Sequence, residues 1–209
     1  DCWTLEPERA YHFPRIKACI EKAHMYDPDI IFEGGVYEIL NKQVERTKVP
    51  AFIFEYFGLP VEERCFVLED MLYLDGHHRN VLGEGNHAPD MSRTETQMWF
   101  LYRASLYIDM GFESIHLGST PSMNDVDKNQ DFAGWKRVTE LIRKYAKAHA
   151  RRGMVLLNAH ATDMKTQKNE LLFDFYAWLI CGWIPKGETD GLPTEDHPQK
   201  IDINLYENE

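Results

Sequence analysis

Two glutamates, Glu33 and Glu55, close short apolar segments that are predicted to be strands, over residues 29–33 and 51–55. Ligands of parallel α/β folds bind at the edge where the strands end. A pair of carboxylates at that edge suits glycoside hydrolysis, because one protonates the leaving oxygen while the other attacks the anomeric carbon or activates water. We therefore predict Glu33 and Glu55 to be catalytic. The alternative for each is that it caps the helix that follows.

A second group of polar side chains lies at the ends of later segments. His116 stands near the end of a third predicted strand, and Asn158 and His160 follow a fourth. Residues two apart in an extended chain point the same way, so Asn158 and His160 should share one face. We predict that these three residues bind substrate hydroxyls or tune the acid, and that Trp178 stacks on a sugar ring. The structural alternatives are a hydrogen bond from His116 to the backbone and an Asn158 side chain that holds its loop.

The same residue types allow a second chemistry. Glutamates and a histidine at strand ends can hold Mg²⁺, Mn²⁺ or Zn²⁺, which would polarise a sugar carbonyl or activate a water. His77, His78 and His87 of a long polar loop could join such a site, although an exposed loop pair is the simpler interpretation of His77 and His78. Because the HExxH motif is absent, we assign no metal ligands and expect no cofactor, with a divalent cation as the alternative.

The elements that must position these residues alternate between strand and helix, which is typical of parallel α/β folds. No GxGxxG or GxxxxGK[ST] motif follows the first strand, which disfavours a nucleotide-binding sheet. We predict a (β/α) TIM-type barrel, incomplete or truncated because eight strands usually need about 250 residues; an open parallel sheet is the alternative. The predicted strands are 29–33, 51–55, 112–117 and 154–157, with a further apolar segment at 171–180, and the predicted helices are 13–26, about 36–44, from a Ser92–Glu95 capping box to Gly111, and from Asp131 to Gly153.

Composition narrows the class of protein. The chain has 209 residues, 34 acidic and 23 basic side chains and a formal net charge of −11, which disfavours a nucleic-acid partner. No apolar run reaches the roughly 18 residues of a membrane span. We predict one barrel-like domain over residues 1–181, with a long loop insertion at 58–91, followed by an acidic tail rich in Pro and Gly at 182–209. The compartment is left open, with secretion or a periplasmic location as options.

Four strand-end segments, separated by helices over residues 13–180, resemble those of glycosidase-type (β/α) barrel proteins of bacteria. The resemblance implies a carbohydrate-active hydrolase with a carbohydrate substrate. The Asn-Glu pair of many retaining barrels is missing from these strand ends. Two further functions stay open: a metal-dependent sugar isomerase, epimerase or hydrolase, and a barrel domain that binds a glycan or a partner without catalysis. The four segments are Ile31-Phe32-Glu33-Gly34-Gly35, Ile53-Phe54-Glu55, Ile115-His116-Leu117-Gly118 and Leu157-Asn158-Ala159-His160.

Overall fold

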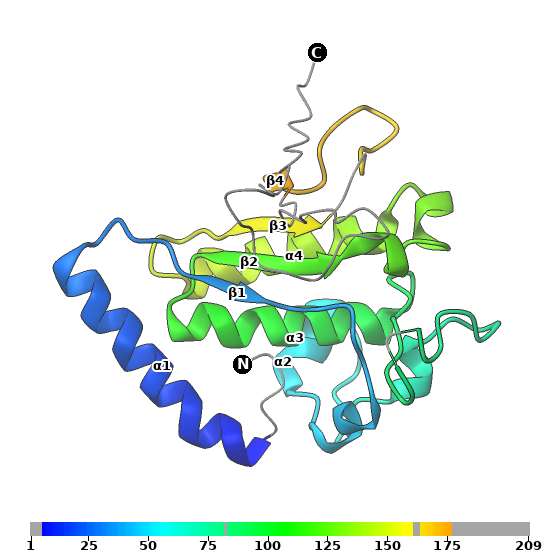
Figure 1. Ribbon diagram of the computed structural model, residues 1–209, viewed down its shortest axis with the longest axis horizontal. Helices are drawn as coiled ribbons and strands as arrows, with labels where there is room; N and C mark the ends of the chain where they lie inside the picture. The colour runs from blue at the N-terminus through cyan, green and yellow to red at the C-terminus, as the bar shows by residue number, and fades with distance from the viewer. Residues whose placement is uncertain (1–5, 82, 161–163, 177–209) are drawn as a thin grey trace, which may run out of the picture. The chain divides into compact units, whose positions relative to one another are not determined.

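The computed structural model describes residues 6–81, 83–160 and 164–176, which form an α/β fold built on one parallel sheet (Figure 1). The four strands follow one another in the sheet in chain order, and every neighbouring pair is parallel. The described residues thus give an open four-stranded sheet, which matches the alternative prediction, and no closed eight-stranded barrel is seen in them. The strands are β1 (Glu33–Gly35), β2 (Ser114–Ser119), β3 (Leu156–His160) and β4 (Phe175–Tyr176).

Helices cover one face of this sheet. Gly34, Ile115 and Leu157 are neighbours in the strand register, so all three face the same side of the sheet. That side faces α3, because a Cβ on Gly34 would meet the ring of Tyr107 in this helix. Ile115 and Leu157 are fully buried on that side, where α3 and α4 pack against each other (Figure 1). The α-helices are α1 (Glu6–Tyr26), α2 (Ala51–Phe57), α3 (Thr94–Met110) and α4 (Ala133–His149), and the 3₁₀ helices are η1 (Lys42–Arg46), η2 (Leu68–Met71), η3 (Thr120–Met123) and η4 (Asp127–Gln130).

Helix α3 is the centre of the fold, and its prediction is confirmed from Thr94 to the left-handed C-cap at Gly111. The predicted capping box is wrong, because Arg93 occupies the N-cap position and no side chain caps the helix there. Glu95 instead accepts two hydrogen bonds from Arg64, at 2.6 and 2.9 Å, and a third from the backbone N–H of Val67 at 3.0 Å. This buried carboxylate ties the long connection before α3 to the first turn of the helix.

Helix α4 is also confirmed, but its N-terminus is held by a different residue from the one predicted. Asp127 is fully buried and accepts hydrogen bonds from the backbone N–H groups of Gly134 at 2.8 Å and Trp135 at 3.1 Å. Asp131, the predicted cap, pairs with Lys136 at 2.6 Å. Asp127 satisfies two of the N–H groups that the first turn of a helix leaves without partners.

The predicted strand over 51–55 is wrong, since this segment forms α2. Pro50 occupies its N-cap position and Gly58 ends it in the left-handed conformation. Ile53, Phe54 and Phe57 are buried at helical spacing. A short apolar run suits a buried strand or a buried helix equally well, so periodicity could not distinguish the two. The predicted helix near 36–44 is wrong as well, because the only helical turns there are those of η1.

The long connection over 58–91 contains the helical turn η2 and is tied to the segment before α2. Two antiparallel bridges make this link, one between Cys65 and Lys48 and one between His87 and Leu40. The predicted boundary near residue 181, the tail at 182–209 and Trp178 lie outside the described residues.

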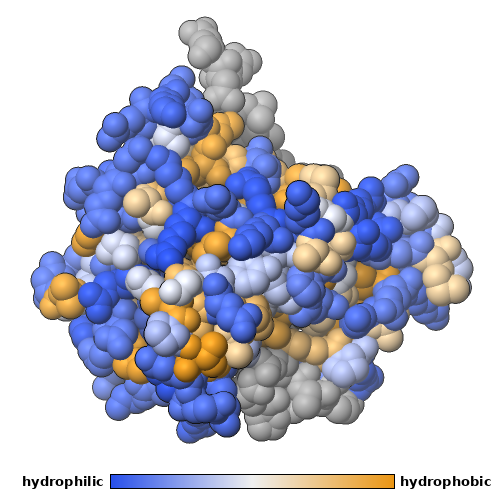
Figure 2. Space-filling model, turned by 180° about the vertical axis from the view of Figure 1, so that it is seen from behind, coloured by the Kyte–Doolittle hydropathy of each residue, from blue (hydrophilic) through white to orange (hydrophobic). Residues whose placement is uncertain are grey.

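The face of the molecule seen in Figure 2 is mostly hydrophilic, with small hydrophobic patches set apart from one another. No helix in the described part of the chain is long and apolar enough to cross a membrane.

Exchanging each of two aspartates for asparagine tests the assignment of the α4 cap. Asp127→Asn leaves one acceptor for two backbone N–H groups, so the free energy of unfolding should fall by about 1–3 kcal/mol. Asp131→Asn is the matched control: it removes a partly exposed ion pair, keeps an amide oxygen to accept the backbone N–H of Gln167, and should cost less than about 1 kcal/mol. Urea denaturation followed by circular dichroism measures both values. An equal or larger cost for Asp131→Asn would contradict the assignment.

Candidate functional site

The face of the sheet opposite the helices carries polar side chains. Strand alternation places Ser114 and His116 of β2 and Asn158 of β3 on this face, and Glu33 and His160 lie on it at the start of β1 and the end of β3. Ser114, His116 and Asn158 are all buried. A buried polar cluster of this kind costs free energy unless its members satisfy one another, so its hydrogen bonds define the site.

Asn158 links the three strands through hydrogen bonds. Its Nδ2 donates to Oε2 of Glu33 at 2.5 Å, and its Oδ1 lies 2.6 Å from Nδ1 of His116. Ser114 Oγ also donates to Oε2 of Glu33, at 2.6 Å. The Asn158 side chain is 0% exposed, which leaves its amide no water to bond with. The amide of Asn158 on β3 therefore sets the positions of both Glu33 on β1 and His116 on β2.

The chemistry of this chain of bonds fixes the proton on His116. An ionised carboxylate only accepts hydrogen bonds, so the amide must turn its Nδ2 toward Glu33 and its Oδ1 toward the imidazole. Nδ1 of His116 must then carry a hydrogen, and in the neutral ring Nε2 is left as the acceptor. That Nε2 is buried and has no hydrogen-bond partner among the described residues. An oriented imidazole with a bare acceptor nitrogen is the arrangement of a general base.

A second imidazole lies beside the first. The rings of His116 and His160 are 4.3 Å apart between centroids. Burial lowers the pKa of His160, and repulsion between the two rings when both are protonated lowers it further, while Glu38 and Glu33 act in the opposite direction. His160 therefore resists protonation on this face.

The segment after β1 closes over one end of this face. The Tyr37 ring lies 6.0 Å from that of His116, and Glu38 Oε2 accepts a hydrogen bond from the backbone N–H of Ser119 at 3.0 Å. Gly35 and Gly118 make room for it: a Cβ on Gly35 would lie 2.7 Å from the Tyr37 ring, and a Cβ on Gly118 would lie 2.6 Å from Glu38 Oε2. Sequence reasoning missed Tyr37 and Glu38, although the glycines at 35 and 118 indicate that another segment of the chain packs closely against the strands at these positions.

The structure brings together four of the predicted site residues, but not at the edge where they were expected. Glu33 begins its strand instead of ending it, and His116 and Asn158 lie in the middle of theirs. The observed strand lies later in the chain than the predicted strand over 29–33. Residues 33–35 pair with β2, whereas Ile30 and Ile31 are exposed. His160 alone lies at a strand's final residue.

Glu55 is not part of this cluster. It is exposed on α2, whose Phe52 and Tyr56 contact Tyr145 of α4, in the helical layer (Figure 1). Glu33 and Glu55 therefore lie on opposite sides of the sheet and do not form the predicted carboxylate pair. The reason is the change of secondary structure over 51–57, which removes the strand end that was to carry Glu55.

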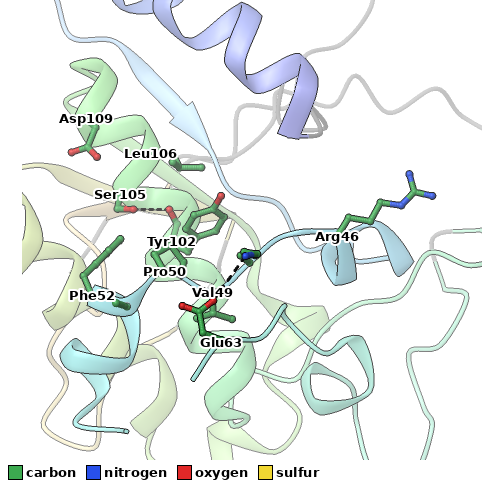
Figure 3. A pocket seen from close by; sticks show the side chains of 11 residues that line it. Arg46, Val49, Pro50, Phe52, Glu63, Tyr102, Ser105, Leu106 and Asp109 are labelled. Carbon is green, nitrogen blue, oxygen red and sulfur yellow. Dashed lines mark hydrogen bonds and ion pairs between the residues drawn. The ribbon is translucent and has the colours of Figure 1, made fainter. Parts of the chain in front are cut away.

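A surface pocket of about 670 Å³ lies between the start of α2 and the side of α3 (Figure 3). Its carboxylates already have partners. Glu63 pairs with Lys48 at 3.9 Å, and Asp109 accepts hydrogen bonds from the Tyr145 hydroxyl at 2.9 Å. None of the polar residues of the sheet face lines this pocket. We therefore place the candidate site on the sheet and not in the pocket.

Comparison with models of known protein families, with curated proteins and with solved structures finds no match for this chain. The candidate site thus rests on the geometry of its own residues.

The lowered pKa of His160 predicts a pH dependence of stability. The folded protein binds a proton at His160 less readily than the unfolded chain does. Below a pH of about 6.5 the unfolded chain is therefore protonated at this residue to a greater extent, which favours unfolding. This contribution to the free energy of unfolding is intact above that pH and is lost as the pH falls. The decline between pH 7.5 and pH 5 should be shallower for His160→Gln than for the parent, measured by urea denaturation. An equal or steeper decline in the variant would contradict the burial of this imidazole.

Proposed function

We propose that the chain is a carbohydrate-active hydrolase whose active site is the polar face of the sheet, with His116 as the general base. The observation that carries the proposal is the buried Nε2 of His116, which has no partner among the described residues. A buried imidazole nitrogen without a hydrogen bond is costly, so its retention is explained by a proton that it accepts during a reaction. The carbohydrate substrate is taken from the resemblance of the strand ends to glycosidase-type barrels.

We also propose that the sheet is part of the wall of a (β/α) barrel. Its strands are parallel and follow one another in chain order, whereas in a doubly wound sheet the order reverses at a switch point. Helices α3 and α4 lie on one face, as on the outside of a barrel. The polar residues lie on the other face, which in a barrel would be the interior.

The geometry supports a reaction in which His116 activates a water. Nε2 takes the proton while the water oxygen forms a bond to the substrate carbon, and the bond to the leaving oxygen breaks. The imidazolium then gives its proton to that leaving oxygen, so protons balance over the cycle. Asn158 and Glu33 act as positioning residues, because they hold the Nδ1–H tautomer that the base requires.

The negative charges of this face support the same reaction. Both Glu33 and Glu38 act on His160 electrostatically, which places two carboxylates in reach of one region of the face. Fixed carboxylates stabilise the positive charge that develops at the anomeric carbon of a sugar and on the His116 ring after proton transfer. In this proposal Glu33 and Glu38 supply the negative charge of the face, and Glu55 has no part in it.

Turnover by four proteins tests the proposal. The parent should release reducing ends or acyl groups from at least one member of a panel of soluble polysaccharides, aryl glycosides and acetylated sugars. His116→Gln should lower kcat/KM by about 100- to 10,000-fold, the usual contribution of a general base. Glu33→Gln should lower kcat more than it changes KM, because it disturbs the base and not the substrate contacts.

Glu55→Gln is the matched control, since it makes the same chemical change on the exposed surface of α2. It should keep the parent activity. Circular dichroism of all four proteins checks that each variant is folded. Full activity in His116→Gln, or loss of activity in Glu55→Gln, would contradict the proposed site, and binding of a glycan without turnover by the parent would show a binding domain instead.

A further inference from the structure

Two consecutive histidines of the long loop converge on one aspartate, and none of these three residues belongs to the polar face of the sheet. His78 Nε2 lies 2.8 Å and His77 Nε2 lies 3.2 Å from the same oxygen, Oδ2 of Asp125. Asp125 belongs to the connection between η3 and η4, nearly fifty residues further along the chain. The ligand atoms of the three side chains all lie within 4.8 Å of one another, and among the described residues this is the group so arranged.

This convergence requires a special backbone. Side chains of consecutive residues in an extended chain point to opposite sides. His78 has a φ of +58°, in the left-handed region that residues other than glycine seldom adopt. The turn at His78 brings its imidazole to the same point as that of His77. A costly local conformation that aligns two imidazoles is explained by what they bind together.

The orientation of His77 is also that of a metal ligand. Its second ring nitrogen, Nδ1, is hydrogen-bonded to Asp75, whose carboxylate also accepts the backbone N–H of His77 at 3.1 Å. Histidines that bind metals almost always donate their other ring N–H to a carboxylate, a backbone carbonyl or a water, which fixes the tautomer and the orientation of the ring. The Tyr73 ring packs against both imidazoles, at 4.0 Å from His77 and 5.2 Å from His78 between centroids, and restricts their movement.

From this geometry we propose a divalent transition-metal site formed by His77 Nε2, His78 Nε2 and an oxygen of Asp125. Two imidazoles and one carboxylate suit Zn²⁺ and the ions that replace it, whereas Mg²⁺ and Ca²⁺ favour oxygen ligands. Bond lengths of about 2.0–2.1 Å to a tetrahedral Zn²⁺ separate its ligand atoms by roughly 3.3 Å. The two distances to Oδ2 of Asp125, 2.8 and 3.2 Å, lie near this value, and the full set of ligand atoms lies within 4.8 Å. Three protein ligands leave the fourth position for water or another ligand.

The metal would join the loop that precedes α3 to the connection that follows β2. The loop with His77 and His78 would be fastened to the connection that leads from β2 to α4, next to the hydrogen bond from the Tyr73 hydroxyl to the backbone oxygen of Ser122. The site uses none of the sheet-face residues, so a test of metal binding does not depend on whether the proposed hydrolase activity is found. The competing account is a plain ion-pair cluster, in which Lys128 Nζ, 3.1 Å from Oδ1 of Asp125, and the two imidazoles neutralise the carboxylate.

Metal titration of the full chain distinguishes these accounts. The protein is stripped with a chelator, and Zn²⁺ binding is measured by calorimetry and Co²⁺ binding by its visible absorption, which reports imidazole coordination. One ion per chain should bind at this site. Asp125→Asn and His78→Gln should each weaken binding at least 100-fold, since even residues that only orient a ligand contribute 10- to 100-fold.

Lys128→Gln is the control within the cluster, because it removes the competing cation and keeps all three ligands. It should bind Zn²⁺ at least as tightly as the parent. Circular dichroism confirms that the variants are folded. A parent that binds no Zn²⁺, or binding that survives both ligand substitutions, would overturn the proposal, as would loss of binding in Lys128→Gln.

Discussion

The candidate site depends on the buried amide of Asn158. This side chain is closed off from water, so both of its polar ends must find partners within the protein. Glu33 takes one end and His116 the other, and each partner comes from a different strand. Because Nδ1 of His116 donates to the amide oxygen, the other ring nitrogen, Nε2, is the acceptor. Because the buried Asn158 amide must bond at both ends, the buried Nε2 of His116 is left as an acceptor without a partner among the described residues.

The rest of the fold serves to make the two faces of the sheet different. Ile115, Leu117, Leu157 and Ala159 pack on the helical layer, and the residues between them face the other way. The buried carboxylates Glu95 and Asp127 fix the starts of the two helices in that layer. Glycines allow the segment after β1 to pass over the polar face at close range. Function on one face therefore depends on packing on the other.

The sequence predicted the parts of the structure in which periodicity is strong. Helices α3 and α4 and strands β2 and β3 were found, and strand alternation correctly placed Asn158 with His160 on one face. Residues 51–55 were mistaken for a strand, because the seven residues of α2 are too few to reveal their helical period. The pairing of Glu33 with Asn158 depends on the register between strands, which no local pattern encodes. The convergence of His77 and His78 on Asp125 likewise depends on a turn and on a contact between distant segments.

The tautomer of His116 is the most direct test of this account. Long-range ¹H–¹⁵N correlation spectra of the ¹⁵N-labelled protein at neutral pH report which ring nitrogen carries the proton. The account predicts a neutral ring with the proton on Nδ1 and a bare Nε2, and loss of this preference in Asn158→Leu. A proton on Nε2 with Nδ1 bare would contradict it, because the amide would then face the opposite way and the base on which the proposed reaction depends would be absent.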